Sequence, residues 1–214
     1  MTDVTALVSA YYAEPFMHRR LTNLKGVDTI VVCQKDSVEH RIAFEYDVQI
    51  ITTPDIPTIG KAWNLAARRA TGDYLTTANT DDMFVGHGLD ILSMQARRAK
   101  ADVCFSSVFR HGIPWKRIID KQGFIRNAAQ RLQKKCFIGP MPLWKRSLHS
   151  KFGWFDETMT VASDYDFWLR LARGGATFYY IDMPLGVYTV RKDSLEHRNK
   201  HLLAQETKQV RKGI

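Results

Sequence analysis

Cysteine is scarce in this sequence, and it does not occur in the patterns that structural cysteines form. The three cysteines, Cys33, Cys104 and Cys136, are far apart and include no C-x-x-C pair. This spacing argues against a disulfide framework and against a cysteine-rich zinc site. The cysteines are therefore predicted to be reduced thiols, as in a cytosolic protein.

Long apolar runs are absent as well. No window approaches the roughly 18 uninterrupted apolar residues that a transmembrane helix needs. The opening residues, MTDVTALVSAYY, lack the basic start and the apolar stretch of a signal peptide. At 214 residues, the chain is long enough for one domain with a substantial core. These features predict a single cytoplasmic domain, which meets a membrane at most peripherally, at its inner face.

Acidic residues are outnumbered, with 22 Asp and Glu against 31 Lys and Arg. The excess belongs to two segments: residues 115–137 carry seven basic residues against one acidic, and residues 190–214 carry seven against three. An anionic membrane surface, an anionic acceptor and nucleic acid are the partners that such segments attract, and a solvated basic helix without a partner is the alternative. Because the basic residues are not interleaved with aromatic residues across one face, no nucleic-acid partner is predicted.

What the sequence does contain is a regular alternation of β-rich and helical segments. Strands are predicted at 5–10, 29–33, 48–52, 74–78 and 102–109, and helices at 14–24, 37–46, 58–70 and 87–99. Two later runs, ATFYYI and LGVYTV, are predicted to form a pair of strands. The alternation predicts an α/β fold in which helices cover both faces of a mostly parallel sheet.

Polar residues stand at the carboxyl ends of the predicted strands, namely Ser9, Gln34, Thr53 and Asn79. In open parallel sheets, ligands bind at the carboxyl ends of the strands. A functional site is therefore expected at this edge.

The stretch NTDD, Asn79 to Asp82, follows the fourth predicted strand. Asn and Asp are common turn residues, so a polar turn is one interpretation. Two adjacent carboxylates repel each other unless a positive charge offsets them, and a divalent cation such as Mg²⁺ binds one or two carboxylates together with substrate phosphates. The sequence alone leaves both interpretations open.

A second acidic cluster opens a predicted helix within residues 161–175. Ser163 lies three residues before Asp166, which is the spacing of a capping box. Asp164 is not needed for that cap, and on a helix it points about 200° away from Asp166. A single carboxylate at a helix start suits the acceptance of a proton from a substrate hydroxyl.

Five motifs in order resemble those of the family-two inverting glycosyltransferases with the GT-A fold. They are SAYYAEP, VVCQKDS, GKAWNLA, NTDD and SDYDFWLRLARGG, and the similarity extends from residue 6 to residue 198. The resemblance implies a single GT-A domain, with a nucleotide-binding half at 1–100, an acceptor-binding half at 101–190 and a basic tail at 191–214. It further implies transfer of a sugar from a nucleoside-diphosphate sugar to an acceptor hydroxyl in surface polysaccharide synthesis.

The resemblance also implies roles for individual residues. Asp164 is the implied catalytic base, and Mn²⁺ or Mg²⁺ is the implied cofactor, with Asp81, Asp82 and His197 as its ligands. Asp166 and Trp168 are implied on the acceptor side, and the acceptor is a saccharide or a lipid-linked molecule. The donor would be bound by Ser9, Tyr11, Glu14, Gln34, Lys61, Asn79, Thr80, Asp81 and Arg191. Packing of Tyr11 and capping by Glu14 are the alternative for those two residues.

The sequence departs from the family pattern at several positions. Asn79 stands where the first Asp of the D-x-D motif is usual, so Asp81 is expected to be the residue that the metal needs. Cys33 and Gln34 replace a pair of Asp residues at the base-reading position, so the favoured UDP-sugar donor does not follow from the motif. Trp63 replaces the usual Arg of the third motif, and Ser163 replaces the Glu before the base.

Three other functions remain open from the sequence. A nucleotidyltransferase shares the need for a metal and a diphosphate, but SAYYAEP lacks the glycines of a phosphate-binding loop. A catalytically degenerate protein and a non-enzymatic binding protein on the same fold are the others. The basic segments 115–137 and 190–214 are the candidate peripheral membrane contacts.

Overall fold

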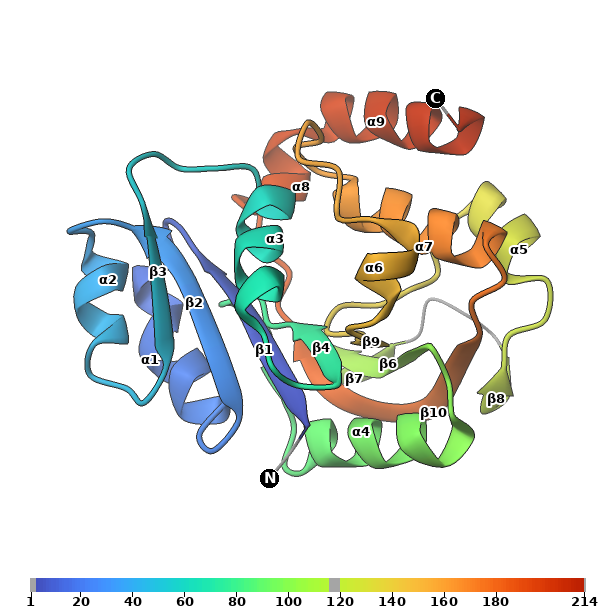
Figure 1. The fold of residues 1–214 in the computed structure, drawn as a ribbon, viewed down its shortest axis with the longest axis horizontal. Coiled ribbons are helices and arrows are strands. Elements are labelled where there is room, and N and C mark those ends of the chain that lie inside the picture. The colour runs from blue at the N-terminus through green and yellow to red at the C-terminus, as the bar shows by residue number, and fades with distance from the viewer. Residues whose placement is uncertain (1–2, 116–119, 214) are drawn as a thin grey trace.

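The computed structural model describes residues 3–115 and 120–213, and it is built on one ten-stranded sheet with the path β3-β2-β1-β4-β9-β6-β10-β5 (Figure 1). The first half of the chain alternates strands with helices. Its elements are β1 (Val4–Ala10), α1 (Glu14–Asn23), β2 (Asp28–Gln34), α2 (Val38–Ala43), β3 (Gln49–Thr53), α3 (Ile59–Arg69) and β4 (Tyr74–Thr77). These four strands are mutually parallel, as the alternation predicts.

The second half of the chain adds short elements around two longer strands. In order these are β5 (Met83–Phe84), α4 (Gly88–Ala99), β6 (Val103–Arg110), β7 (Ile113–Trp115), β8 (Gly123–Phe124), α5 (Ala128–Lys134), β9 (Leu143–Lys145), α6 (Leu148–Phe152), α7 (Ser163–Arg173), β10 (Phe178–Tyr188), α8 (Leu195–Arg198) and α9 (Lys200–Lys212). Strand β9 is antiparallel to both β4 and β6, and β10 is parallel to β6. The carboxyl ends of β1, β2, β3, β4, β6 and β10 therefore meet at the same edge of the sheet.

Helices cover both faces of the sheet. Successive residues of each strand point to opposite faces, so each strand packs against helices on both sides. Leu7 packs into the core with α3, α6 and α7, whereas its neighbours Ala6 and Val8 pack into the core with α1, α2 and α4. This is the three-layer α/β/α arrangement predicted from the sequence (Figure 1). All three cysteines are free, as predicted.

One expectation about the elements is corrected. The runs ATFYYI and LGVYTV belong to a single strand, β10, whose pairing with β6 shifts register on both sides of Pro184. Proline cannot donate to the ladder, so the strand continues through an irregularity at that residue. The basic segment 115–137 contains β8 and the short helix α5, and its residues 116–119 lie outside the described residues.

No helix in the described ranges 3–115 and 120–213 is both long enough and apolar enough to cross a membrane.

Candidate functional site

The acidic stretch Asn79–Asp82 forms a turn at the carboxyl edge of the sheet, directly after β4. The backbone N–H of Asp82 donates to the carbonyl oxygen of Asn79 at 3.3 Å, so the turn interpretation is confirmed. The end of β10 holds this turn from the other side. The Thr189 backbone N–H donates to Asp82 Oδ1 at 2.9 Å, and the Thr189 hydroxyl donates to the Asp81 carbonyl oxygen at 2.5 Å. The turn is therefore fixed by a residue more than one hundred positions away along the chain.

The two adjacent carboxylates have opposite environments. Asp82 is 1% exposed, and burial, together with the charge of Asp81, raises its pKa to about 7 against the opposing effects of the Thr189 N–H and Arg20. The Asp81 carboxylate is 20% exposed and lies 3.6 Å from the guanidinium of Arg191. Asp81 is thus the carboxylate that a ligand can reach, while Asp82 supports the turn from beneath.

A buried cation lies under the acidic turn. Arg20 of α1 is fully buried, donates to Asn23 Oδ1 at 3.0 Å and stacks on the ring of Phe84 at 5.2 Å. Burial lowers the pKa of Arg20 to about 10, against the opposing charges of Asp82 and Asp81. The sequence interpretation missed this residue. The signal was present, because Arg20 shares helical spacing with the buried Met17 and so occupies a core position of the helix.

Arg191, which the resemblance implies for donor binding, lies beside the acidic turn. Besides its contact with Asp81, its guanidinium donates to both oxygens of Asp193 and stacks on the ring of Phe16 at 4.4 Å. Arg19 adds a second cation at the same turn, since its guanidinium donates to the Asp81 carbonyl oxygen at 2.9 Å. The turn is thereby bordered by positive charge, which suits an anionic ligand.

The loops after the other parallel strands meet at the same edge. The Tyr11 hydroxyl lies 2.8 Å from Thr53 Oγ1, and Gln34 Nε2 donates to the Pro54 carbonyl oxygen at 3.1 Å. Tyr12 is 78% exposed and adopts a positive φ of 54°, so the loop after β1 presents it outward. Ser9 is half-buried near the end of β1. These contacts bring the ends of β1, β2 and β3 together, as expected.

The start of α1 is held by a residue that sequence reasoning missed. Glu14 is exposed in the first turn of the helix, but its side chain makes no capping bond. Instead, the buried carboxylate of Glu39 accepts a bond from the Ala13 N–H at 2.7 Å. Glu39 comes from α2, so nothing in the local sequence around Glu14 pointed to this contact.

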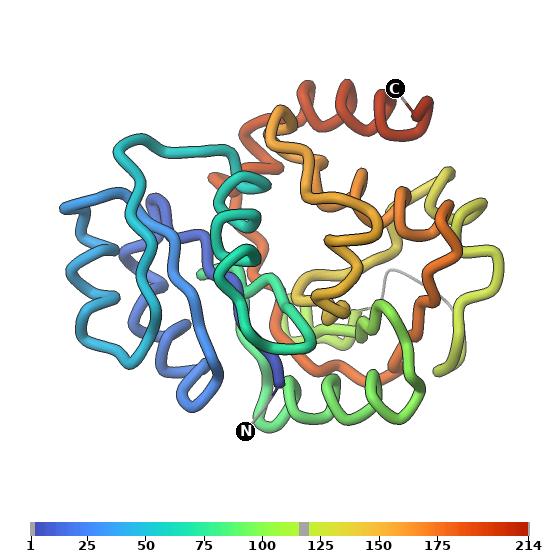
Figure 2. Tube along the Cα trace, viewed as in Figure 1, coloured from blue at the N-terminus to red at the C-terminus, as the bar shows by residue number. Residues whose placement is uncertain are grey.

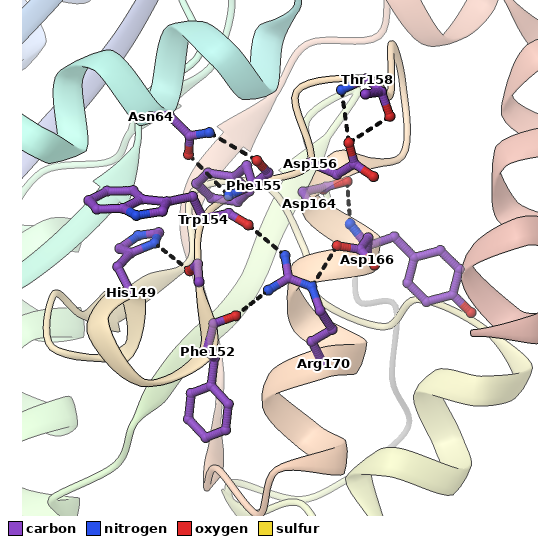
Figure 3. Close-up of polar contacts among 12 residues, drawn as sticks. Asn64, His149, Phe152, Trp154, Phe155, Asp156, Thr158, Asp164, Asp166 and Arg170 are labelled. Atoms are coloured by element: carbon purple, nitrogen blue, oxygen red, sulfur yellow. Dashed lines mark hydrogen bonds and ion pairs between the residues drawn. The ribbon is translucent and has the colours of Figure 1, made fainter. Parts of the chain in front are cut away.

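The starts of α3 and α7 touch each other, which places Lys61 and Asp164 on neighbouring helix ends. A Cβ atom on Gly60 would lie only 2.9 Å from Ser163 Oγ. Figure 3 shows Asn64 of α3 bound to the backbone of Phe155, at 2.9 Å through its amide nitrogen and at 3.0 Å through its oxygen. Lys61 is exposed and Asp164 is half-buried, with its Oδ1 accepting a bond from the Tyr165 N–H at 2.7 Å.

The expected capping box at Ser163 is wrong. The N-cap residue of α7 is Ala162, which has no capping side chain, and the buried Ser163 hydroxyl has no hydrogen-bond partner among residues 3–115 and 120–213. The Asp166 carboxylate instead accepts from Arg170 at 2.8 Å, and Arg170 also donates to the carbonyl oxygens of Phe152 and Trp154 (Figure 3). Asp166 therefore helps, through Arg170, to hold the loop before α7.

Trp168, which the resemblance implied on the acceptor side, is a core residue. It is 1% exposed and packs edge-to-face on Trp144 with ring centroids 5.4 Å apart. Its periodic spacing with the other apolar residues of α7 is the pattern of a buried face, and that pattern, rather than the motif, describes its position.

The three implied metal ligands are not gathered into one cluster. Within the described residues, no three His, Cys, Asp or Glu side chains group so as to hold a metal ion. His197 pairs with Ser194, whose hydroxyl lies 2.8 Å from its Nδ1, and Thr80 is buried in the turn. Asp81 offers reachable carboxylate oxygens and Asn79 is half-buried, whereas Asp82 is covered. The residues of the turn fit a hard cation that takes its remaining oxygens from a bound ligand.

The sequence matches no protein-family model and no curated protein sequence. Among solved structures, the fold resembles that of S. aureus TarS, residues 1–349, with a TM-score of 0.72 at 16% identity, over 88% of this chain and 60% of that one. The same fragment in complex with UDP-GlcNAc gives a TM-score of 0.76 at 15% identity, over 91% and 60% of the two chains. Its complex with UDP gives 0.70 at 16% identity, over 96% and 65%.

The predicted fold is confirmed by this similarity. TarS has the GT-A-type fold of the family-two glycosyltransferases, and the present chain shares that architecture. The chain spans about three fifths of the length of the TarS fragment that it matches.

Proposed function

We propose that this protein is a metal-dependent, inverting glycosyltransferase that uses a nucleoside-diphosphate sugar, with a UDP-sugar favoured. The observation that carries the proposal is the turn at the carboxyl edge, in which Asp81 is reachable and bordered by Arg191 while Asp82 is buried beneath it. The shared fold with TarS, which has been solved with UDP-GlcNAc and with UDP, supports a nucleotide-sugar donor.

The donor diphosphate would lie against the acidic turn. Mn²⁺ or Mg²⁺, held by Asp81 with support from Asn79, would offset the negative charge that develops on the leaving diphosphate. Arg191 and Lys61 would contribute further positive charge at the same edge. The Arg191 guanidinium lies 3.6 Å from the Asp81 carboxylate, so it would reach a diphosphate bound at the turn.

Asp164 would act as the general base. The acceptor hydroxyl gives its proton to the Asp164 carboxylate, and the acceptor oxygen bonds to the anomeric carbon. The bond from that carbon to the diphosphate oxygen breaks on the opposite face, and its electron pair leaves with the nucleoside diphosphate. One direct displacement of this kind inverts the anomeric configuration.

The acceptor would be a saccharide or a lipid-linked molecule in surface polysaccharide synthesis. The basic residues of 115–137 and 190–214 support an anionic acceptor or an anionic lipid surface near the site. Many cations of the C-terminal segment are exposed, among them Lys192, Lys208 and Lys212.

The proposal is tested by thermal shift and by transfer assays on wild type and on Asp164→Asn. A true ligand stabilises the folded state, so UDP with Mn²⁺ at about 100 times its Kd should raise the Tm by about 5 °C or more. The Asn variant should show the same shift but should lose about a hundredfold or more in kcat, because the base is gone. Asp90→Asn, an exposed substitution on α4, is the matched control.

Three results would contradict the proposal in different ways. If no nucleoside diphosphate stabilises the protein with or without metal, the donor site is wrong. If Asp164→Asn loses donor binding, the assignment of Asp164 as base is wrong. If a nucleotide binds but wild type transfers no sugar from any donor, the protein binds nucleotides without being a transferase.

A further inference from the structure

A carboxylate from the last helix closes the start of α7. Glu206 of α9 is 4% exposed, although a glutamate is seldom buried without partners. Its Oε1 accepts from the Thr160 N–H at 2.8 Å, and its Oε2 accepts from the N–H groups of Val161 and Ala162 at 2.9 and 2.8 Å. Both oxygens are thus bound to three successive backbone amides that lead into the helix. Figure 2 shows this loop rising toward α9.

Of these three amides, only that of Ala162, the N-cap residue of α7, is among the unpaired N–H groups of the helix start; Thr160 and Val161 belong to the loop before it. The N-cap position usually carries a polar side chain, but in α7 it is alanine. Hydrogen bonds to a carboxylate are stronger than neutral ones, and burial strengthens them further. Glu206 therefore fixes, from a distance, the loop and the N-cap residue from which α7 begins.

Helix α9 is anchored on α7 at a second point beyond Glu206. Arg211 Nε donates to the Tyr165 hydroxyl at 3.2 Å, and the Tyr165 hydroxyl donates to the Leu132 carbonyl oxygen. Val210 is 3% exposed between these contacts. Asp164 thus lies between the amides that Glu206 binds and the tyrosine that Arg211 binds.

We propose that Glu206 is a positioning residue for Asp164, so that the C-terminal helix controls the geometry of the proposed base. This inference rests on the proposed function. Asp164 lies two residues after Ala162, the last residue whose amide Glu206 binds. The orientation of the Asp164 carboxylate therefore depends on the loop that Glu206 holds. Without the carboxylate, residues 160–162 would bind water instead, and the first turn of α7 would fray together with Asp164.

The test compares Glu206→Gln with Glu206→Asp and with the control Glu196→Gln. A glutamine at 206 keeps the size of the side chain but replaces one acceptor oxygen with an NH₂ group that faces backbone donors. Glu196 is an exposed glutamate of the same C-terminal segment, so its substitution removes a charge without disturbing the bonds of Glu206 to residues 160–162. Should Glu206→Gln fail to fold by circular dichroism, Glu206→Asp, which keeps the charge, carries the comparison.

Hydrogen exchange and steady-state kinetics give the two readouts. In Glu206→Gln the amides of residues 160–162 should exchange about tenfold faster or more, because local opening becomes easier. The kcat for sugar transfer should fall about tenfold or more while the donor KM stays within about twofold, as expected when only the reacting geometry is lost. Glu206→Asp should be intermediate in both readouts, and Glu196→Gln should match wild type.

Each contrary outcome is decisive. Unchanged exchange at residues 160–162 overturns the inference whatever the activity. Faster exchange with unchanged kcat, or a fall in kcat accompanied by an equal loss of donor binding, shows that Glu206 supports the fold without positioning Asp164. A wild-type protein that transfers no sugar overturns the proposed function, and the positioning role falls with it. The exchange result still establishes whether Glu206 holds residues 160–162, so the two failures are distinguishable.

Discussion

At the scale of single residues, burial decides which ionisable groups meet a ligand and which hold the fold. His149 illustrates the second kind. Its ring is 3% exposed and stacks on Phe167 and Trp154 with centroids 4.8 and 4.7 Å away. Trp144 Nε1 donates to His149 Nε2, so in the neutral ring Nδ1 carries the proton and donates to the Gly153 carbonyl oxygen. Burial lowers the pKa of His149 to about 4.

This histidine predicts a loss of stability in mild acid. The folded pKa is about 4 and the unfolded value is 6.5, so the unfolded chain binds the proton first as the pH falls. Stability from this group is therefore complete above 6.5 and declines between 6.5 and about 4. Between about pH 7.5 and pH 5 the loss should be about 2 kcal/mol, measured by urea unfolding. His149→Gln should lose less over this range than wild type, and the exposed His201→Gln should lose as much. Equal losses in all three proteins would contradict the assignment.

At the scale of elements, the site depends on how closely helix starts approach each other. Gly60 of α3 has no side chain where α7 passes. A Cβ atom there would lie 2.9 Å from Ser163 Oγ and 3.0 Å from the Asp156 carbonyl oxygen. Only glycine permits this approach, and the approach brings Lys61 and Asp164 onto adjoining helix ends.

Gly60→Ala should therefore destabilise the protein, although alanine favours a helix by about 1 kcal/mol over glycine. The added methyl group must push the two helices apart, at a cost of about 1 to 3 kcal/mol measured by chemical unfolding. Transfer activity should fall as well. Combining it with Ser163→Gly should recover part of the loss in a double-mutant cycle. An unchanged or raised stability of Gly60→Ala would show that the helices do not touch as described.

At the scale of the whole molecule, the acidic turn and the basic residues belong to different parts of the chain. The acidic turn lies at the carboxyl edge of the sheet, whereas the positive excess is concentrated in two segments of the second half. Helix α9 turns Glu206 and Val210 inward and leaves Lys208 and Lys212 exposed. One face of this helix therefore holds the loop before α7, and the other presents basic side chains to the outside.

Vesicle sedimentation tests the proposed membrane contact. Wild type should bind vesicles that contain an anionic lipid and should be released by salt, because each basic residue near such a surface contributes about 1 kcal/mol that salt screens. Lys208→Gln combined with Lys212→Gln should weaken binding about tenfold or more. Neutral phosphatidylcholine vesicles and the variant Lys25→Gln in the first half of the chain are the controls. Equal binding of neutral and anionic vesicles would contradict an electrostatic contact.

The sequence by itself determined the fold and the edge of the sheet where the candidate site lies. Periodicity and turn residues are local properties, so the strands, the helices and the polar strand ends followed from them. The ordered motifs pointed to Asp81 and Asp164. The sequence did not predict that β10 is a single strand. Pro184 indicates a break between two strands unless the pairing with β6 is known.

Only the tertiary structure decided what each side chain does at that edge. It separated Asp81 from Asp82 by burial, left Ser163 outside any capping box and bound residues 160–162 to Glu206. It also put the fully buried Arg20 beneath the acidic turn. The physical reason is the same in each case. Desolvation and hydrogen bonding depend on neighbours that are distant in the chain, and a local pattern carries no record of them.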